Sequence, residues 1–231
     1  SDAVESEGNV MMAVTDGADA AGLVGPLTAD QVAARIAANV ALRWQPSGCA
    51  TVTSSGANVT IKFDDCTGPR GLLHVTGELD LVVSISAAGA IDVAGTASGL
   101  QVNRAVLDVD THAEYTVSGT MHQLAVQTTG TGTGPFGNTI DHSGNYTVAW
   151  DPASTCGSID GMWSTEISNT TASATRSNEL NVMRCAGGCP TGTLVHTGFA
   201  GVTLTVTFDG SATASWTTST GKSGTFALQC Q

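Results

Sequence analysis

Strict alternation of apolar and hydroxyl side chains is the pattern that most constrains the fold of this chain. In residues 201–216, GVTLTVTFDGSATASW, four apolar side chains alternate with three threonines before an Asp-Gly pair. Successive side chains of a β-strand point to opposite faces, so this segment predicts a strand with one apolar and one polar face. Asp-Gly between two such runs is a strong hairpin signal. The pattern recurs in NVTIKF and GELDLVVSI and predicts an antiparallel all-β protein.

The strands continue to the end of the chain. After Gly48 we expect roughly twelve to fifteen strands joined by short turns, which make sequence neighbours antiparallel. An open antiparallel sheet of more than about ten strands must curl, close or split into two layers. We therefore expect residues 48–231 to form a large twisted meander, a sandwich or a barrel-like sheet.

One helix is predicted before the strands, over residues 28–46. Thr28 is a good N-cap, and Gln31 three residues later completes a capping box. Apolar residues recur at helical spacing, as Val32, Ile36 and Val40. Pro46 stops the helix, which we expect to pack on one face or one end of the sheet.

Weak sequence similarity between segments of the chain suggests repeated hairpin modules. TGPRGLLHVTGELDLVVS at 67–84 resembles TGPFGNTIDHSGNYTVAW at 133–150, and residues 189–206 are a looser third copy. Gly and Pro fix turns in these segments. We expect hairpin-like internal repeats within one continuous sheet.

Charge and composition exclude several classes of partner. The net charge is −12, which repels nucleic acid and anionic lipid, so neither is expected as a partner. Charged residues make up only 12% of the chain, so it lacks the signature of a disordered protein. No apolar run approaches the ~20 residues of a membrane helix.

The six cysteines can be paired by hairpin arithmetic. Residues that face each other in a hairpin have a constant index sum, so the midpoint of a pair should fall in a turn. Midpoints at turn signals in 56–58, 169–172 and 209–210 predict the disulfides Cys49–Cys66, Cys156–Cys185 and Cys189–Cys230. Alternation places Cys66 on the polar face of its strand, with Lys62. A Cys185–Cys189 loop is the rival for the last two pairs, and a zinc site is the alternative interpretation of CAGGC.

Three disulfides indicate an oxidising compartment, which is the periplasm, the cell surface or the medium. The polar, acidic start SDAVESEG is typical of a mature N-terminus whose targeting segment has been removed. A lipid anchor would be the one link to a membrane.

The stretches GCATV…DDCTGPRG and CAGGCPTGTLVHTG resemble those of uncharacterised secreted lipoproteins of Gram-negative bacteria. The resemblance covers residues 28–231 and rests on turn and cysteine motifs. It implies an extracellular or cell-surface location in a Gram-negative bacterium and an all-β fold. It implies no activity.

The segment LDVDTHAEY is the clearest candidate for chemistry. Alternation puts Asp108, Asp110, His112 and Glu114 on one face of a strand. A second row of this kind contains His74, Thr76, Glu78 and Asp80. Ligands along one strand are about 6.6 Å apart, so a neighbouring strand would have to complete a calcium or zinc site. The alternative is the solvent-facing polar side of a sheet. We expect no cofactor, with calcium as the exception to test.

No catalytic constellation is evident, and we expect no enzyme activity. There is no G-x-S-x-G elbow, and the disulfides use every thiol. His142 and His196 lie beside turns and are expected at the surface. Trp44, Trp163 and Trp216 fit core positions, and Trp150 and Tyr146 fit either a sugar platform or the core.

These observations favour a non-enzymatic extracellular structural protein, a subunit of a cell-surface assembly or filament. Residues 1–27 form an N-terminal extension containing NVMMAV at 9–14. Its apolar residues would add to the sheet edge of a neighbour as an assembly strand made of Val10, Met11, Met12, Ala13 and Val14. Expected partners are other copies of the chain or another surface protein. The alternative is a surface lipoprotein that acts as a glycan-, cation- or protein-binding module.

Overall fold

The computed structural model describes residues 27–68 and 74–230 of the 231-residue chain. In these residues the helical elements are α2 (Ala29–Val40) and the short 3-10 helix η2 (Ala41–Arg43). The strands are β1 (Ala50–Ser55), β2 (Asn58–Thr67), β3 (His74–Ile85), β4 (Ile91–Val102), β5 (Ala105–Ser118), β6 (Met121–Thr133), β7 (Thr139–Asp151), β8 (Cys156–Ser168), β9 (Ser173–Cys185), β10 (Thr191–Thr197), β11 (Thr203–Asp209), β12 (Thr213–Thr218) and β13 (Ser223–Ala227).

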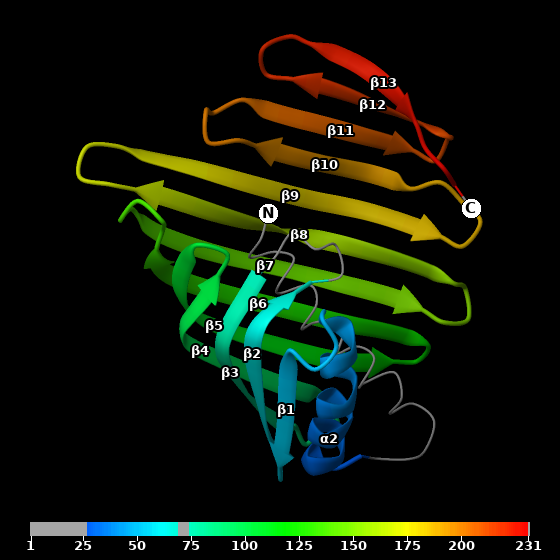
Figure 1. The fold of residues 1–231 in the computed structure, drawn as a ribbon. Helices are drawn as coiled ribbons and strands as arrows, with labels where there is room; N and C mark the ends of the chain where they lie inside the picture. The colour runs from blue at the N-terminus through cyan, green and yellow to red at the C-terminus, as the bar shows by residue number, and fades with distance from the viewer. Residues whose placement is uncertain (1–26, 69–73, 231) are drawn as a thin grey trace. The chain divides into compact units, whose positions relative to one another are not determined.

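All thirteen strands belong to one antiparallel sheet, in which each strand pairs with its neighbours in sequence (Figure 1). The sheet is not closed, because β1 and β13 are its two edge strands. The prediction of a large antiparallel meander is confirmed, and the sandwich and the barrel are wrong. Neither helix in the described part of the chain has the length and apolar character needed to cross a membrane.

The chain divides into two compact units. Unit 1 comprises residues up to Thr116 together with Thr128–Ile140, and unit 2 comprises Val117–Gln127 together with residues from Asp141 onward. Strands β5, β6 and β7 contribute residues to both units.

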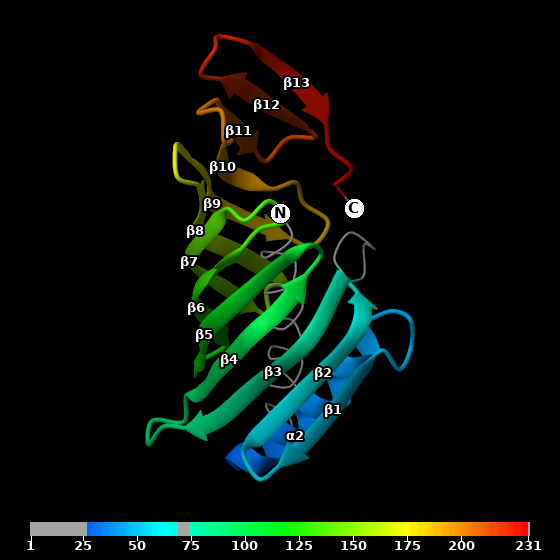
Figure 2. The ribbon, with the colours of Figure 1, turned by 60° about the vertical axis from the view of Figure 1, so that its left-hand side comes forward.

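In unit 1 the helix α2 covers the first strands of the sheet (Figure 2). Thr28 and Gln31 form the predicted capping box, in which each side chain accepts the backbone N–H of the other residue. The helical segment ends at Arg43, earlier than the predicted boundary at residue 46. Its buried face consists of Val32, Ala33, Ile36 and Val40.

The core of unit 1 lies between this helix and the apolar face of β1–β3, and buried side chains continue along β4 and β5. Trp44 follows η2 and is only 2% exposed, and its ring packs edge-on against that of Phe63 at 4.8 Å. The alternating residues of the strands supply the rest, including Val59, Ile61, Leu81, Val83 and Val93. Sequence alternation therefore identified the inward face of these strands correctly.

The disulfide Cys49–Cys66 is present as predicted, but Cys66 is not on the polar face of β2. The pairing of β2 with β3 shifts between Phe63 and Cys66, and Asp65 takes a positive φ of 49° at this bulge. A bulge adds a residue to one strand and so reverses the side on which the following residues point. It turns Cys66 inward, where its side chain is fully buried.

The described residues of unit 2 are strands of a single sheet layer. We call β8–β13 the C-terminal sheet. Its register brings apolar side chains into three adjacent rows across the strands. This apolar face carries Ile159, Trp163, Leu180, Val182, Leu194, Leu204, Val206, Phe208, Ala214, Trp216 and Phe226. The opposite, hydroxyl face carries mainly Thr and Ser, such as Thr193, Thr207, Ser215 and Thr225 in one row.

The other two predicted disulfides are present in unit 2. Cys156 and Cys185 are opposite each other at the end of the β8–β9 hairpin. Cys189 and Cys230 lie outside the β11–β12 hairpin, before β10 and after β13. The chain after β13 runs back along the strand ends to reach Cys189 (Figure 1), and the N–H of Leu228 donates to the carbonyl oxygen of Ala212 at 2.9 Å.

Candidate functional site

The candidate row on β5 lies on one exposed face, as alternation predicts. Asp108, Asp110, His112 and Glu114 are all exposed. Neighbouring strand β4 faces them with Ser98, Thr96, Ala94 and Asp92. The neighbour thus supplies two hydroxyl groups and a single carboxylate, and carboxylates do not gather around one point.

Asp108 has a specific structural role. Its Oδ1 accepts the backbone N–H of Gly99 at 2.7 Å and the hydroxyl of Ser98 at 2.9 Å. These donors lie where the β4–β5 register shifts between Ala97 and Leu100. The Gly99 N–H, and after it the Ser98 hydroxyl, hold the pKa of Asp108 below its usual value. Asp108 thus closes a bulge of β4.

The rest of the row makes separate local contacts. His112 Nε2 lies 3.6 Å from Asp92 Oδ1, and Glu114 is opposite Asp92 in the ladder. Asp110 is opposite Thr96. Among the described residues no three His, Cys, Asp or Glu side chains converge in a way that would hold a metal ion. Whether the row binds calcium therefore stays a prediction.

The second row, on β3, is directed toward β2. Lys62 Nζ lies 3.2 Å from Glu78 Oε2, and the Thr60 hydroxyl donates to Asp80 Oδ1 at 2.7 Å. Strand β4 separates this row from the row on β5, and Thr96 lies between Asp80 and Asp110. Two strand spacings are about 10 Å, whereas calcium ligands lie about 2.3–2.6 Å from the ion. The two rows therefore do not form one site.

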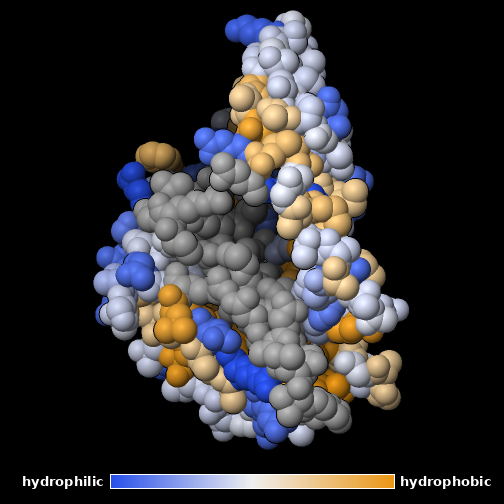
Figure 3. Space-filling view, turned by 90° about the vertical axis from the view of Figure 1, so that its right-hand side faces the viewer, coloured by the Kyte–Doolittle hydropathy of each residue, from blue (hydrophilic) through white to orange (hydrophobic). Residues whose placement is uncertain are grey.

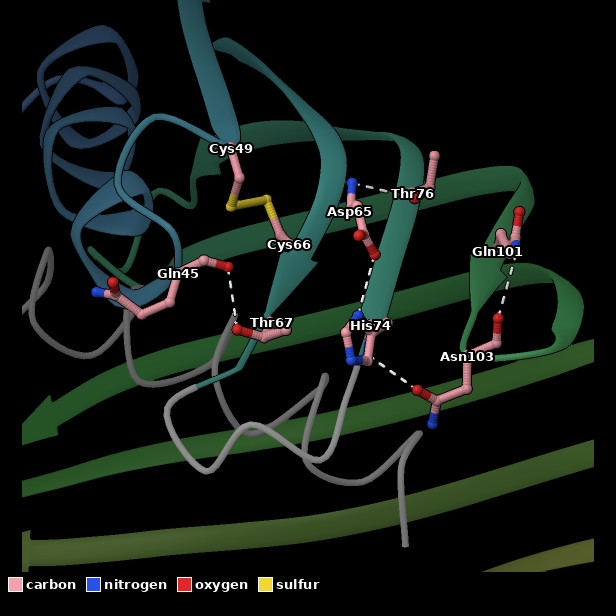
Figure 4. Close-up of polar contacts among 9 residues, drawn as sticks. All are labelled: Gln45, Cys49, Asp65, Cys66, Thr67, His74, Thr76, Gln101 and Asn103. Atoms are coloured by element: carbon pink, nitrogen blue, oxygen red, sulfur yellow. Dashed lines mark hydrogen bonds and ion pairs between the residues drawn. A yellow bond between two sulfur atoms is a disulfide. The ribbon is translucent and has the colours of Figure 1, made fainter.

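His74 of the second row belongs to a polar cluster at the ends of β2, β3 and β4 (Figure 4). Its Nδ1 lies 3.0 Å from Asp65 Oδ1, and its backbone N–H donates to Asn103 Oδ1 at 2.9 Å. The N–H of Asp65 donates to the Thr76 hydroxyl at 3.1 Å. The His74 and Asp65 side chains are 53% and 78% exposed. These contacts hold the bulge of β2 against its neighbours, which is a structural role.

Two other histidines differ from expectation. His142 was expected at the surface but is buried in unit 2, with Nδ1 2.8 Å from the Thr165 hydroxyl oxygen. His196 is half-buried, with Nδ1 2.7 Å from Asn178 Oδ1. Each ring contacts the neighbouring strand, and such cross-strand pairing cannot be recognised from the proximity of a turn.

The cysteines are structural. All six form the three disulfides, so the Cys185–Cys189 loop is wrong and CAGGC provides no thiolate pair for zinc. Three disulfides are consistent with an oxidising, extracellular compartment.

Sequence reasoning missed a hollow in the described part of the chain. It has a volume of about 310 Å³ and lies on the hydroxyl face of unit 2. Its polar lining comprises Asn145, Asp160, Glu179, Asn181 and Thr193, with Met162 and Val195 beside them. The residues come from four consecutive strands, and the amide of Asn181 donates to Asp160 Oδ2 at 2.8 Å. Each is an ordinary polar strand position in the sequence, and only the register brings them together.

The candidate sugar platforms are elsewhere. Trp150 is half-buried, with its ring 5.3 Å from that of His122. Tyr146 is the residue after Asn145 in β7 and so points to the face opposite the hollow. Trp163 and Trp216 are half-buried on the apolar face, and Trp44 is the tryptophan that fits the core prediction fully.

The proposed assembly strand, Val10–Val14, lies outside the described residues. The strand edges that could receive it are described. Within the described ranges 27–68 and 74–230, β13 pairs only with β12, and β1 pairs only with β2. Neither edge strand contains a charged residue or a proline.

Comparison of the chain with protein-family models, with curated proteins and with solved structures finds no match.

Proposed function

We propose that this chain is a non-enzymatic structural protein of the cell exterior, a subunit that assembles by β-strand addition at β13. The observation that carries the proposal is the open edge of the sheet. Natural sheet edges are usually protected by charged residues, prolines or covering elements. β13 has the sequence SGTFA and contains neither a charge nor a proline.

The hydrogen bonding of β13 determines which backbone groups are available at the edge. The N–H of Leu228 donates to the carbonyl oxygen of Ala212, and the N–H of Thr218 donates to the carbonyl oxygen of Lys222. In an antiparallel ladder every second pair of opposite residues is hydrogen-bonded, so the pairs between these two positions can be assigned. Phe226 then bonds inward to Ala214, its partner in the register. The N–H and C=O groups of Thr225, its neighbour, point outward. An added strand would pair with these groups.

The proposed donor is residues 9–14 of another copy. NVMMAV contains Val10, Met11, Met12, Ala13 and Val14, which provide apolar side chains for a neighbour's sheet. Donor and acceptor are different surfaces, so the contact is heterologous and builds filaments when it does not close into a ring. Three disulfides would make such a subunit durable outside the cell. Attachment as a Gram-negative lipoprotein is part of the same proposal.

A substitution at the outward-facing backbone tests this function. Thr225→Pro removes one outward N–H and leaves the inward ladder of β13 intact, because proline is tolerated at such edge positions. Thr225→Ala is the matched control, since it changes the side chain and keeps the N–H. We expect filaments of purified protein in electron micrographs for wild type and Thr225→Ala, and isolated particles for Thr225→Pro. Filaments of equal length in all three would reject β13 as the acceptor.

A second candidate function is a glycan-binding module, which the 310 Å³ hollow favours. Its carboxylates, amides and hydroxyl offer both acceptors and donors to the hydroxyl groups of a saccharide. The test is a glycan array probed with wild type and with Asn181→Leu, which removes the amide that bonds Asp160. A glycan that binds wild type but not Asn181→Leu would support this function. Equal glycan binding by the two proteins, or no glycan bound by wild type, would reject it.

A further inference from the structure

The apolar face of the C-terminal sheet has no second layer among the described residues of unit 2, which are strands of one sheet. A sheet with one apolar face is stable when another layer buries that face. Most side chains of the face are only half-buried, and Phe226 is 43% exposed. Figure 3 shows apolar groups side by side at the height at which Figure 1 draws the C-terminal strands, and further apolar groups lower down.

The three rows of this face contain no Asp, Glu, Lys or Arg. One row runs from Ile159 to Phe226, the next from Gly161 to Gly224, and the third from Trp163 to Thr218. The chain as a whole carries a net charge of −12, so two copies repel each other over most of their surfaces. An uncharged, apolar surface is where a second copy can approach without bringing like charges together.

We propose that a second copy of this chain covers the apolar face, so that two C-terminal sheets pack face to face. The first two rows span six strands and the third spans five, and at about 4.8 Å between strands and about 6.6 Å between rows these positions give a face of roughly 540 Å². Two such faces bury roughly 1,080 Å², just above the roughly 1,000 Å² that a biological interface needs. A two-fold axis makes the contact self-complementary, because the same face is used by both copies.

The pattern around the face agrees with a protein interface. Its centre is formed by aromatic and aliphatic side chains, among them Trp216, Leu194 and Val206. The third row adds a polar rim, where Asn178 and His196 already satisfy each other through a contact of 2.7 Å. An apolar centre with a polar rim is the usual anatomy of such contacts.

This inference deepens the proposed self-assembly, but it uses the face of the sheet and not the edge of β13. Sedimentation equilibrium of the full chain with three disulfides tests it, over concentrations from micromolar upward. Every sample, including the one with the wild-type face, also carries Thr225→Pro, so that strand addition at β13 does not build filaments. Leu194→Glu puts a charge into the centre of the apolar face, on the internal strand β10. Thr207→Glu is the matched control, because it puts the same charge on the hydroxyl side of the neighbouring strand β11, outside the hollow.

We expect wild type and Thr207→Glu to form dimers, and Leu194→Glu to dissociate at least about tenfold more readily, because the dimer would bury its charge. Circular dichroism establishes that each variant is folded. If Leu194→Glu does not fold, Phe226→Glu replaces it, and Thr207→Glu remains the control. Monomeric wild type at every concentration would overturn the inference, and so would equal weakening by both variants. A chain lacking residues 1–14 would lose filaments and keep dimers, which separates failure of strand addition from failure of the face contact.

Discussion

The carboxylate of Asp108 accepts the backbone N–H of Gly99 at 2.7 Å, across the strand pair β4–β5. Two further aspartates hold turns in the same manner. Asp151 accepts the N–H of Ala153 at 2.9 Å, and Asp209 accepts the N–H of Ser211 at 2.9 Å. In this all-β chain, exposed carboxylates therefore serve as acceptors for backbone groups that the ladder leaves unpaired.

Acid should destabilise the fold through these carboxylates. Hydrogen bonds lower the pKa of Asp108, Asp151 and Asp209 from 3.8, chiefly through the Gly99 N–H, the Ala153 N–H and the Ser211 hydroxyl. The unfolded chain binds these protons at higher pH than the folded chain does. The stability that these hydrogen bonds contribute is complete above the pKa of an aspartate in the unfolded chain. It is lost as the pH falls through the lower pKa values of the folded chain. We expect the urea midpoint to fall below pH 3.8 in denaturation curves.

The variant Asp108→Asn provides the control for that pH dependence. The asparagine side chain cannot ionise. The urea midpoint of this variant should therefore be lower than that of wild type at neutral pH, and it should fall less than that of wild type in acid. An identical acid dependence for wild type and Asp108→Asn would show that this carboxylate does not contribute.

Calcium should leave the stability of the protein unchanged. Asp110 and His112 are exposed, and the acidic row on β3 lies two strands away from them. Differential scanning fluorimetry of wild type and of Asp110→Asn/His112→Asn should give equal melting temperatures with and without calcium. If calcium raised the melting temperature of wild type but not that of the double variant, this row would be established as a cation site.

Gly192→Ala should destabilise the β9–β10 pairing by more than 1 kcal/mol, because its backbone has a φ of +114°. A Cβ at this position would also overlap the carbonyl oxygen of Asn181. Gly198→Ala is the control, because the nearest atom to its Cβ would lie 3.8 Å away. Urea denaturation compares the two, and equal midpoints would contradict the close strand approach at Gly192.

Removal of the Cys189–Cys230 disulfide should loosen β13. The bond closes a segment with a sequence separation of 41, and the chain-entropy estimate for such a loop is about 4 kcal/mol. Replacing both cysteines by serine should reduce hydrogen-exchange protection in β13 first. The matching change at Cys156 and Cys185 should affect the β8–β9 end and spare β13. Unchanged protection of β13 in the first variant would contradict the role of the disulfide.

The fold was predictable because its pairings are local in sequence. Alternation and turn signals identify each strand, and in a meander the next strand is also the neighbour in space. The Cys156–Cys185 pair followed from this directly, since the two residues are opposite each other in the ladder. Cys189–Cys230 was also predicted correctly, although two further strands lie outside the central hairpin.

The β-bulges, and the sites formed by residues of several strands, were not predictable from the sequence. The bulge beside Asp65 turns Cys66 inward, and β2 itself has no glycine to mark it, because the glycine at the register shift is Gly77 on the partner strand β3. The hollow that contains Asp160 and Glu179 depends on the register of four strands. A strand pattern shows which face a residue occupies, but it does not show which residues of other strands stand beside it.

Electron microscopy of the protein as released from its native cell surface, compared with a version that lacks residues 1–14, tests the assembly proposal most directly. The proposal predicts filaments for the complete chain and isolated particles for the shortened one, since the donor strand 9–14 is then missing. Isolated particles in both samples would contradict a filament subunit and would favour the binding-module function. Filaments in both would contradict residues 9–14 as the joining strand.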